Sequence, residues 1–392
     1  MNFILNIIIF ILWPFGGFLY SLIRPINRLT YLFFAIFFFL IGSSFYLQNE
    51  LADSFRYAEN YREFCENGME TMFFYYFILL GQLDIYTFLT YSICSYISDN
   101  PRVLFGLYGA VFGIFVCHYY VLIKKDNWKN NNLYYWIFIF IIYLLNPHTN
   151  INGVRFWTAT WMFFSLLISC VMFNKKKNLF FICLTPLIHT SYIIPLLLFL
   201  LSRLKFFKTK TIYIFSISLF IISFVFDMNN FINLLPSDFG VFSHFQAYLD
   251  GEYMKEIAQK ADSRSMIYRI LSTSSICFCL YILNKVYNNT SIMTTDDVKL
   301  LDFALLLFSF CSFFGGIPSV GRFYTLLYMI TIYLLYRLYI VRKNKSISLI
   351  TLLLFPCFCT IIYNNLNYHS IVINPIYIYG SLGDIISFSL SY

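Results

Sequence analysis

The stretch Asn152-Gly153-Val154-Arg155, followed by the apolar run Phe156–Phe173 (FWTATWMFFSLLISCVMF), is the most informative part of this chain. The run carries no charged residue and is long enough to cross about 30 Å of hydrocarbon as a helix. Arg155 therefore stands where a membrane helix would begin, beside the polar stretch Asn146–Asn150. An arginine close to hydrocarbon persists mainly where it meets water, a counter-charge or an anionic ligand. We therefore expect a membrane-spanning helix that begins at a functional cation, Arg155.

The composition indicates that the rest of the chain is also embedded in a membrane. The 392 residues are 59% hydrophobic and 12% charged, with a mean hydropathy of +0.69, whereas a soluble domain is roughly a quarter charged. We expect an all-α polytopic membrane protein. Several further apolar runs are long enough to span a bilayer: Phe3–Ile23, Thr30–Leu47, Val103–Ile123 and Phe323–Val341.

The basic residues predict the orientation of the chain. Lysines concentrate in short loops between apolar runs: Lys124, Lys125, Lys129, Lys175–Lys177, Lys205, Lys208, Lys210, Lys343 and Lys345. The positive-inside rule makes these loops cytoplasmic, so the net charge of +8 reflects orientation and indicates no nucleic-acid partner. The apolar runs then give about ten transmembrane helices with both termini outside. We expect one integral membrane domain, 1–392, with outer loops over residues 49–101 and 233–265.

Two apolar segments do not fit as simple crossings. Thr71–Ser98 has a polar midpoint, Gly81–Asp84, and is predicted to form a pair of re-entrant or interfacial helices. Leu179–Leu201 has basic clusters at both ends; either it forms a cytoplasmically anchored hairpin with His189 at its apex, or one cluster breaks the positive-inside rule. Irregular backbone at membrane depth is tolerated where it lines a cavity or is buried in protein. We therefore expect the two segments to face each other around a cavity open to the outside.

The basic residues expected outside are mostly arginines, whose planar fork holds phosphate bidentately and stays protonated. Arg155, Arg269 and Arg322 stand at predicted helix starts, where free amide groups and the macrodipole also favour anions. Such a site suits a lipid-linked phosphate or pyrophosphate. Alternatively, each arginine snorkels to the interface or pairs with an outer acid. Because Arg155 and Arg322 have no acid within several residues, we favour the binding role for these two.

Two other groups are candidates for chemistry. Asp53, Arg56 and Tyr57 have i,i+3 and i,i+4 spacing, so on a helix they form either a salt bridge in a solvated loop or a sugar-binding group of charges and rings. His189, flanked by Thr190 and Ser191, is either a hydrogen-bonded structural residue or a general base. The sequence has no P-loop, dinucleotide-binding glycine motif or zinc-binding pattern, and we expect no metal and no cofactor.

The chain resembles the EpsG / Wzy-type polymerases of exopolysaccharide and O-antigen synthesis. The matching features occur in order over roughly residues 45–330: Asp53…Arg56-Tyr57, Asn152–Arg155, Lys175–Lys177, Ile188–Tyr192 and Gly321–Tyr324. The resemblance implies a GT-C-like membrane glycosyltransferase in the cytoplasmic (inner) membrane, with its active site facing the periplasm or cell exterior. It implies an oligosaccharide donor on undecaprenyl pyrophosphate, with membrane lipids around the protein. The sequence does not say whether a chain-length regulator also binds.

Under this hypothesis the base is His189 or Asp53. The predicted substrate-binding residues are Arg56, Tyr57, Asn152, Arg155, Arg264, Arg269, Arg322 and Tyr324. The sequence leaves other functions open, namely a lipid-linked oligosaccharide flippase or transporter, a membrane sugar O-acetyltransferase, and an O-antigen ligase.

Overall fold

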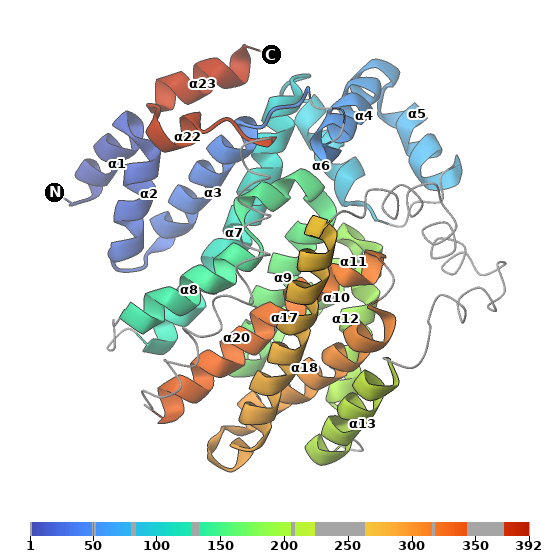
Figure 1. The fold of residues 1–392 in the computed structure, drawn as a ribbon. Helices are drawn as coiled ribbons and strands as arrows, with labels where there is room; N and C mark the ends of the chain where they lie inside the picture. The colour runs from blue at the N-terminus through green and yellow to red at the C-terminus, as the bar shows by residue number, and fades with distance from the viewer. Residues whose placement is uncertain are drawn as a thin grey trace. The chain divides into compact units, whose positions relative to one another are not determined.

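The computed structural model describes residues 2–48, 50, 52–79, 84–127, 133–204, 208–223, 263–315, 318–342 and 372–391. These residues are mainly helical (Figure 1), and β-type pairing among them is limited to an isolated bridge between Phe45 and Ile373. The all-α prediction is therefore confirmed for the described residues. Outside the described residues lie the last expected span, 346–363, and residues 233–262 of the expected outer loop 233–265.

The chain forms two compact units. The first comprises Met1–Asn131, Asn146–Ile193 and Tyr363–Tyr392, and the second comprises Asn132–Leu145 and Ile194–Ile362. Both units are therefore assembled from separated stretches of sequence. The single membrane domain stays a prediction.

In the first unit, helix α7 (Pro101–Asn127) packs against α3 (Arg28–Ser43) and α9 (Val154–Met172). Glycines let α3 and α7 approach closely, as is common between membrane helices. A Cβ atom at Gly42 would lie 2.0 Å from the Phe105 carbonyl oxygen, and one at Gly109 would lie 2.1 Å from that of Phe38. These close contacts fix α7 as the central helix on which the other elements of this unit are placed.

The expected first span, Phe3–Ile23, is not one helix. It forms α1 (Asn2–Leu12) and α2 (Pro14–Ile23), separated at Trp13, and each is shorter than the roughly 20 residues that cross a bilayer. Proline is tolerated at the first position of a helix but disrupts a helix interior; Pro14 therefore starts α2 while the chain bends at Trp13. At the other end of α2, the Lys124 ammonium group donates to the carbonyls of Leu22 and Arg24, at 2.7 and 2.6 Å. The ends of α2 and α7 thus lie together, as their predicted common cytoplasmic side requires.

The C-terminal helices α22 (Ile376–Tyr379) and α23 (Leu382–Leu390) pack on the N-terminal helices of the same unit (Figure 1). Arg102, near the start of α7, donates to the Phe388 carbonyl and to the Ser391 hydroxyl. A cation at a helix C-terminus offsets the partial negative charge there. Arg102 therefore has a structural role at the end of α23.

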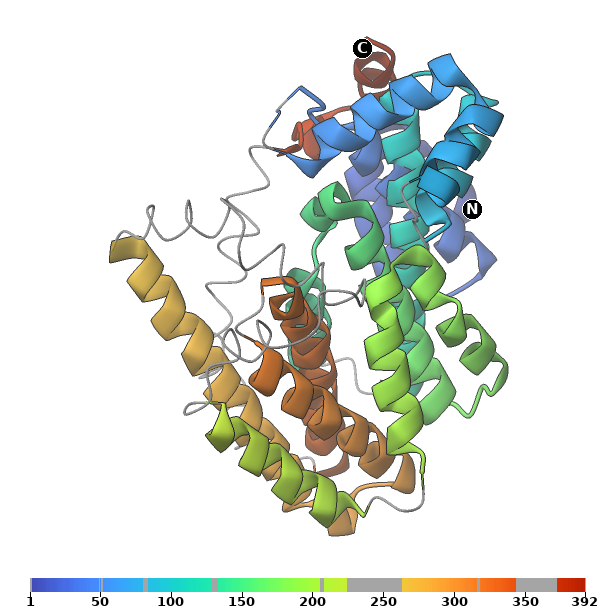
Figure 2. The ribbon, with the colours of Figure 1, turned by 90° about the vertical axis from the view of Figure 1, so that its right-hand side faces the viewer.

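The segment after α3 consists of short elements. It contains α4 (Asp53–Asn67), α5 (Met69–Phe73), the π-helix η1 (Phe74–Leu79) and α6 (Tyr86–Ser95). Figure 2 shows α4 lying across the end of α7. As its polar midpoint predicted, no single helix runs through Thr71–Ser98, because Asp84 and Ile85 are not helical. Its depth in the membrane stays a prediction.

A second series of short elements flanks α9. The 3₁₀ helix η2 (His148–Gly153) precedes α9. After α9 come α10 (Lys177–Cys183), α11 (Thr185–Ile188), η3 (Thr190–Tyr192) and α12 (Ile193–Ser202). Both α10 and α11 pack along α9. The helical conformation is interrupted at His189, which is extended and lies between α11 and η3.

The second unit contains longer helices, shown in Figure 2. Its elements are α8 (Leu133–Leu145), most of α12, α13 (Thr209–Ile222), α17 (Ser263–Tyr287), η4 (Thr290–Ile292), α18 (Thr295–Phe314), α19 (Pro318–Gly321) and α20 (Phe323–Arg342). Helix α18 packs against α13, α17 and α20. Arg337 of α20 donates through Nε to the fully buried Asp297 of α18 at 2.9 Å, so a charge pair joins these two helices.

Among the described residues, two stretches are long and apolar enough to cross a membrane by length and composition: Pro101–Lys125 and Tyr135–Met172. The second stretch comprises most of α8 together with η2 and α9. Shorter apolar helices accompany them, including Leu29–Ser43 and Thr209–Ile222. The count of about ten transmembrane helices and the GT-C-like arrangement stay predictions.

Thiol labelling in intact cells tests the orientation. Native Cys65 is a slow probe, because it is half-buried and burial raises the pKa of its thiol. The exposed positions Asn67 on α4 and Lys176 before α10 are better sites. In a Cys65→Ser background we expect Asn67→Cys to react with a membrane-impermeant reagent in intact cells, and Lys176→Cys to react only after permeabilisation. The background protein without an added cysteine is the control, and the reverse pattern would invert the topology.

Candidate functional site

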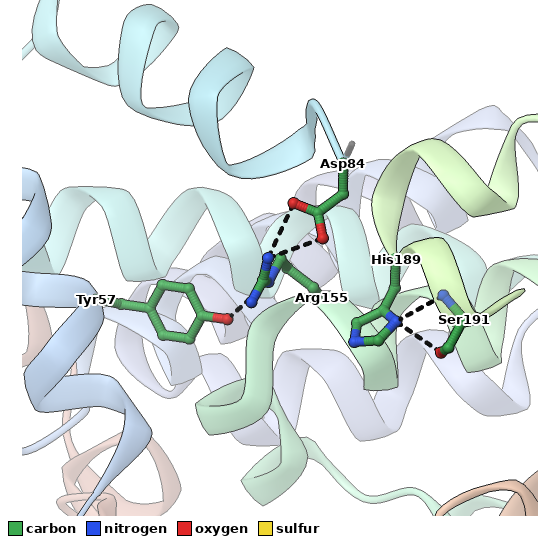
Figure 3. Close-up of polar contacts among 5 residues, drawn as sticks. All are labelled: Tyr57, Asp84, Arg155, His189 and Ser191. Carbon is green, nitrogen blue, oxygen red and sulfur yellow. Dashed lines mark hydrogen bonds and ion pairs between the residues drawn. The ribbon is translucent and has the colours of Figure 1, made fainter. Parts of the chain in front are cut away.

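Arg155 is the centre of a polar cluster built entirely from the first unit. Its Nη1 atom donates to both carboxylate oxygens of Asp84, at 2.9 and 2.8 Å, and its Nε atom donates to the Tyr57 hydroxyl at 3.0 Å (Figure 3). Arg155 lies in the first turn of α9, Tyr57 lies on α4, and Asp84 lies just before α6. Three elements that are distant in the sequence therefore hold one guanidinium group.

Burial makes the pairing between Arg155 and Asp84 strong. The Asp84 side chain is only 7% exposed, and the Arg155 side chain is 28% exposed. Removing a charge from water is costly unless the charge is paired, and a cation in the first turn of a helix faces the positive end of the macrodipole. Asp84 offsets both penalties. Asp84 and Tyr57 thus hold the guanidinium group while part of the Arg155 side chain stays exposed.

Asp84 corrects the sequence argument for Arg155. The lack of an acid within several residues indicated a missing counter-charge, but the counter-charge comes from 71 positions earlier in the chain. One local signal was present, because Asp84 is an acid in the polar break of an otherwise apolar segment. Ionisable residues in such segments are generally functional or paired.

Each residue of Asn152-Gly153-Val154-Arg155 has a defined place. The Asn152 side-chain oxygen accepts from the Ser54 backbone N–H at 2.8 Å, which joins η2 to the start of α4. A Cβ atom at Gly153 would lie 2.7 Å from the Trp157 ring and 3.9 Å from Asp53 Oδ2, so there is little room for a side chain. Val154 is fully buried. The motif thus places α4 over the start of α9, with Tyr57 beside Arg155.

The polar stretch before this motif has a structural role. The Asn146 side-chain amide donates to the Trp157 backbone carbonyl at 3.0 Å, and the Asn146 backbone carbonyl accepts from the Trp161 indole N–H at 2.8 Å. His148 Nε2 and the Tyr377 hydroxyl are 2.9 Å apart. These contacts fix the turn that leads into α9. The Asn152 side-chain oxygen is likewise already bound to α4, so a substrate contact for Asn152 stays a prediction.

The predicted i,i+3 ion pair between Asp53 and Arg56 is present. The two side chains are 40% and 73% exposed, and exposed pairs of this kind contribute little to stability. Asp53 is therefore a solvent-accessible carboxylate near Gly153, at the start of α9. Burial raises the pKa of the nearby Tyr57 phenol, so this hydroxyl stays protonated at neutral pH.

Further aromatic rings pack beside Tyr57 of the Arg155 cluster. The rings of Tyr57 and Tyr86 each pack against Tyr108, with centroid separations of 6.3 and 5.7 Å. Tyr76 of η1 is buried within electrostatic range of Arg155. Rings bring apolar area together with a polar hydroxyl group. This region therefore combines one fixed cation with several phenols.

The two interrupted segments contact each other next to this cluster. The Ile85 backbone N–H donates to the Leu187 carbonyl at 2.9 Å, so the breaks before α6 and after α11 lie side by side. The His189 ring packs edge-on against Phe156, at a centroid distance of 5.3 Å. The prediction that the two segments face each other is confirmed by this hydrogen bond. A cavity between them stays a prediction.

The other predicted site residues lie in the second unit. Arg322, between α19 and α20, is exposed, and the Tyr324 hydroxyl donates to the Cys311 carbonyl at 2.7 Å. Arg264 and Arg269 lie on α17, but their side chains are outside the described part of the structure. Within the described residues, no group of three or more His, Cys, Asp and Glu side chains could hold a metal ion.

These features define an all-helical membrane protein in which a charge-paired arginine opens a long apolar helix. The chain belongs to the EpsG family, whose sequence model matches residues 29–380, nearly the whole chain. The matched range includes Tyr57, Asp84, Arg155 and His189, and the family is associated with glycosyltransferase-like polymerase activity in polysaccharide biosynthesis. No curated protein and no solved structure matches the chain significantly.

Proposed function

We propose that the protein is a polysaccharide polymerase that joins oligosaccharide repeat units carried on undecaprenyl pyrophosphate, at the outer face of the cytoplasmic membrane. Family membership supports the reaction class. The observation that carries the proposal is Arg155, a cation held at the start of an apolar helix by Asp84 and Tyr57 with part of its surface accessible. A site of this kind suits an anionic headgroup whose lipid tail lies in the bilayer.

In the proposed reaction a hydroxyl group of the acceptor repeat unit attacks the anomeric carbon of the donor glycan. The new glycosidic bond forms as the bond to the pyrophosphate oxygen breaks, and undecaprenyl pyrophosphate leaves with its electron pair. Arg155 stabilises the charge that develops on the leaving group, which is usually the largest contribution to catalysis. The accessible carboxylate of Asp53 takes the hydroxyl proton.

The remaining predicted residues have supporting roles in this proposal. Tyr57 and Arg56 on α4 contact sugar hydroxyls and ring faces, and Asn152 holds α4 in place for this purpose. Arg264, Arg269, Arg322 and Tyr324 are further proposed substrate-binding residues. Chain-length regulation by a partner protein is part of the same proposal.

Lipid-linked oligosaccharide transport is the second candidate function. It is favoured by the interrupted helices of the first unit, since discontinuous helices form the binding sites of many transporters. An O-acetyltransferase would add acetyl groups to the glycan, and an O-antigen ligase would transfer finished polymer from its lipid, so both differ from a polymerase in their product.

Depletion of the protein in its host tests the proposal. We expect polymer to disappear and single lipid-linked repeat units to accumulate at the outer leaflet. The material that accumulates separates the alternatives, because each function acts at a different step. Repeat units retained at the inner leaflet would indicate a transporter, a normal polymer without acetyl groups would indicate an O-acetyltransferase, and full-length polymer left on its lipid would indicate a ligase.

A further inference from the structure

The contact between His189 and Ser191 defines which nitrogen of the imidazole carries the proton. His189 Nδ1 accepts a hydrogen bond from the Ser191 backbone N–H at 3.3 Å, and the Ser191 hydroxyl lies 2.7 Å from the same nitrogen. A backbone N–H can only donate, so Nδ1 must present its lone pair. In a neutral imidazole the proton then lies on Nε2, which makes Nε2 a hydrogen-bond donor.

This tautomer disfavours the general-base role predicted for His189. To accept a proton at Nε2, the neutral ring would have to carry its proton on Nδ1, where it would point at the Ser191 N–H. The backbone geometry at the break favours the observed arrangement, because His189 has an extended conformation and caps η3. The protein therefore presents an N–H group at Nε2 rather than a lone pair.

The position of the imidazole brings this donor to the Arg155 cluster. Its ring packs against Phe156, the residue that follows Arg155, and Leu187 is hydrogen-bonded to Ile85, the residue that follows Asp84. Figure 3 shows the His189 ring between Ser191 and Arg155, with Nδ1 facing Ser191. In this view the second ring nitrogen lies on the side of the ring away from Ser191, toward Arg155.

We propose that His189 donates a hydrogen bond through Nε2–H to a phosphate oxygen of the anionic ligand at Arg155, and that Ser191 is the positioning residue that fixes its tautomer. This inference rests on the proposed function, in which that anion is a lipid pyrophosphate. A neutral donor at the break after α11 and a cation at the start of α9 then share one anion. Hydrogen bonds to charged groups are stronger than neutral ones, and loss of this one is expected to lower turnover about ten- to a hundredfold.

Two amide substitutions separate a donor from a base. In His189→Gln the side-chain amide nitrogen can occupy the place of Nε2 and donate. In His189→Asn the amide reaches only the place of Nδ1, so it keeps the contact with Ser191 but has no donor at the place of Nε2. We expect glutamine to retain activity within a few-fold and asparagine to lose about ten- to a hundredfold, at equal protein abundance and thermal stability. The readout is glycan lengthening by purified protein supplied with lipid-linked repeat units.

Binding of inorganic pyrophosphate to the purified full chain in detergent gives a second readout. The donor role predicts weaker binding by the His189→Asn variant and near-normal binding by His189→Gln. Loss of lengthening in both variants would overturn the proposal in favour of a base, and normal lengthening in both would make His189 purely structural. If the unsubstituted protein itself neither binds pyrophosphate nor lengthens glycan, the proposed function fails instead.

Discussion

Arg155→Lys protein is expected to insert and accumulate normally yet form polymer about ten- to a hundredfold more slowly. The guanidinium group uses Nη1 for Asp84 and Nε for Tyr57, and a single ammonium group cannot reproduce this planar fork. One charge-assisted bond is worth about 1.5–3 kcal/mol, which corresponds to this loss of turnover when the bond acts in the transition state. An arginine that only anchors the helix at the interface would tolerate lysine, because a long cationic stem suffices.

Arg62→Lys is a matched control for this experiment. Arg62 forms a surface pair with Glu59 on α4, and its replacement is expected to leave polymer unchanged. Arg322→Lys tests the predicted role of the second unit in the same assay and is also expected to lose polymer. Near-normal polymer from both Arg155→Lys and Arg322→Lys would contradict pyrophosphate binding by either residue and direct attention to Arg56, Arg264 and Arg269.

The second large effect concerns the charge pair between Arg155 and Asp84. Breaking a buried pair on one side costs about 3–5 kcal/mol, because the other charge is left without a partner. In the Arg155→Met variant the Asp84 carboxylate is left unpaired, and at 7% exposure it cannot be rehydrated. In the Asp84→Asn variant the Arg155 guanidinium group is left unpaired, and at 28% exposure it is partly rehydrated. We therefore expect Arg155→Met to lower thermal stability in detergent more than Asp84→Asn does.

Polymer formation is expected to fall in both variants, because Asp84 orients the guanidinium group. The double variant Arg155→Met/Asp84→Asn should recover part of the lost stability, since no buried charge remains, but should stay inactive. Asp99→Asn, at an exposed acid, is the control and should change neither property. Additive stability losses in the double variant would show that the two side chains do not interact. Tighter pyrophosphate binding by Asp84→Asn would show that Asp84 competes with the ligand.

Local sequence patterns predicted much of the first unit correctly. The start of α9 next to Arg155, the ion pair between Asp53 and Arg56, and the interruption of Thr71–Ser98 all depend on residues close together in the chain. Pro14 also gave a local signal for the break between α1 and α2, but the apolar residues on both sides made one span the simpler interpretation.

The contacts that complete the site could not be predicted in this way. Asp84 reaches Arg155 across 71 positions, and Asn152 reaches Ser54 across 98. Such pairings depend on how the helices pack, which hydrophobic periodicity does not specify. The tautomer of His189 is a similar case: Ser191 was visible as a neighbour, but the direction of the hydrogen bond depends on the backbone conformation at the break.

Reconstitution of the purified protein in vesicles with lipid-linked repeat units tests the central claim most directly. We expect the glycan on the lipid to lengthen by whole repeat units at the face on which Asn67 is exposed, and Arg155→Lys protein to lengthen it about ten- to a hundredfold more slowly. Movement of unchanged repeat units between leaflets, with no lengthening, would rule out a polymerase and identify a transporter.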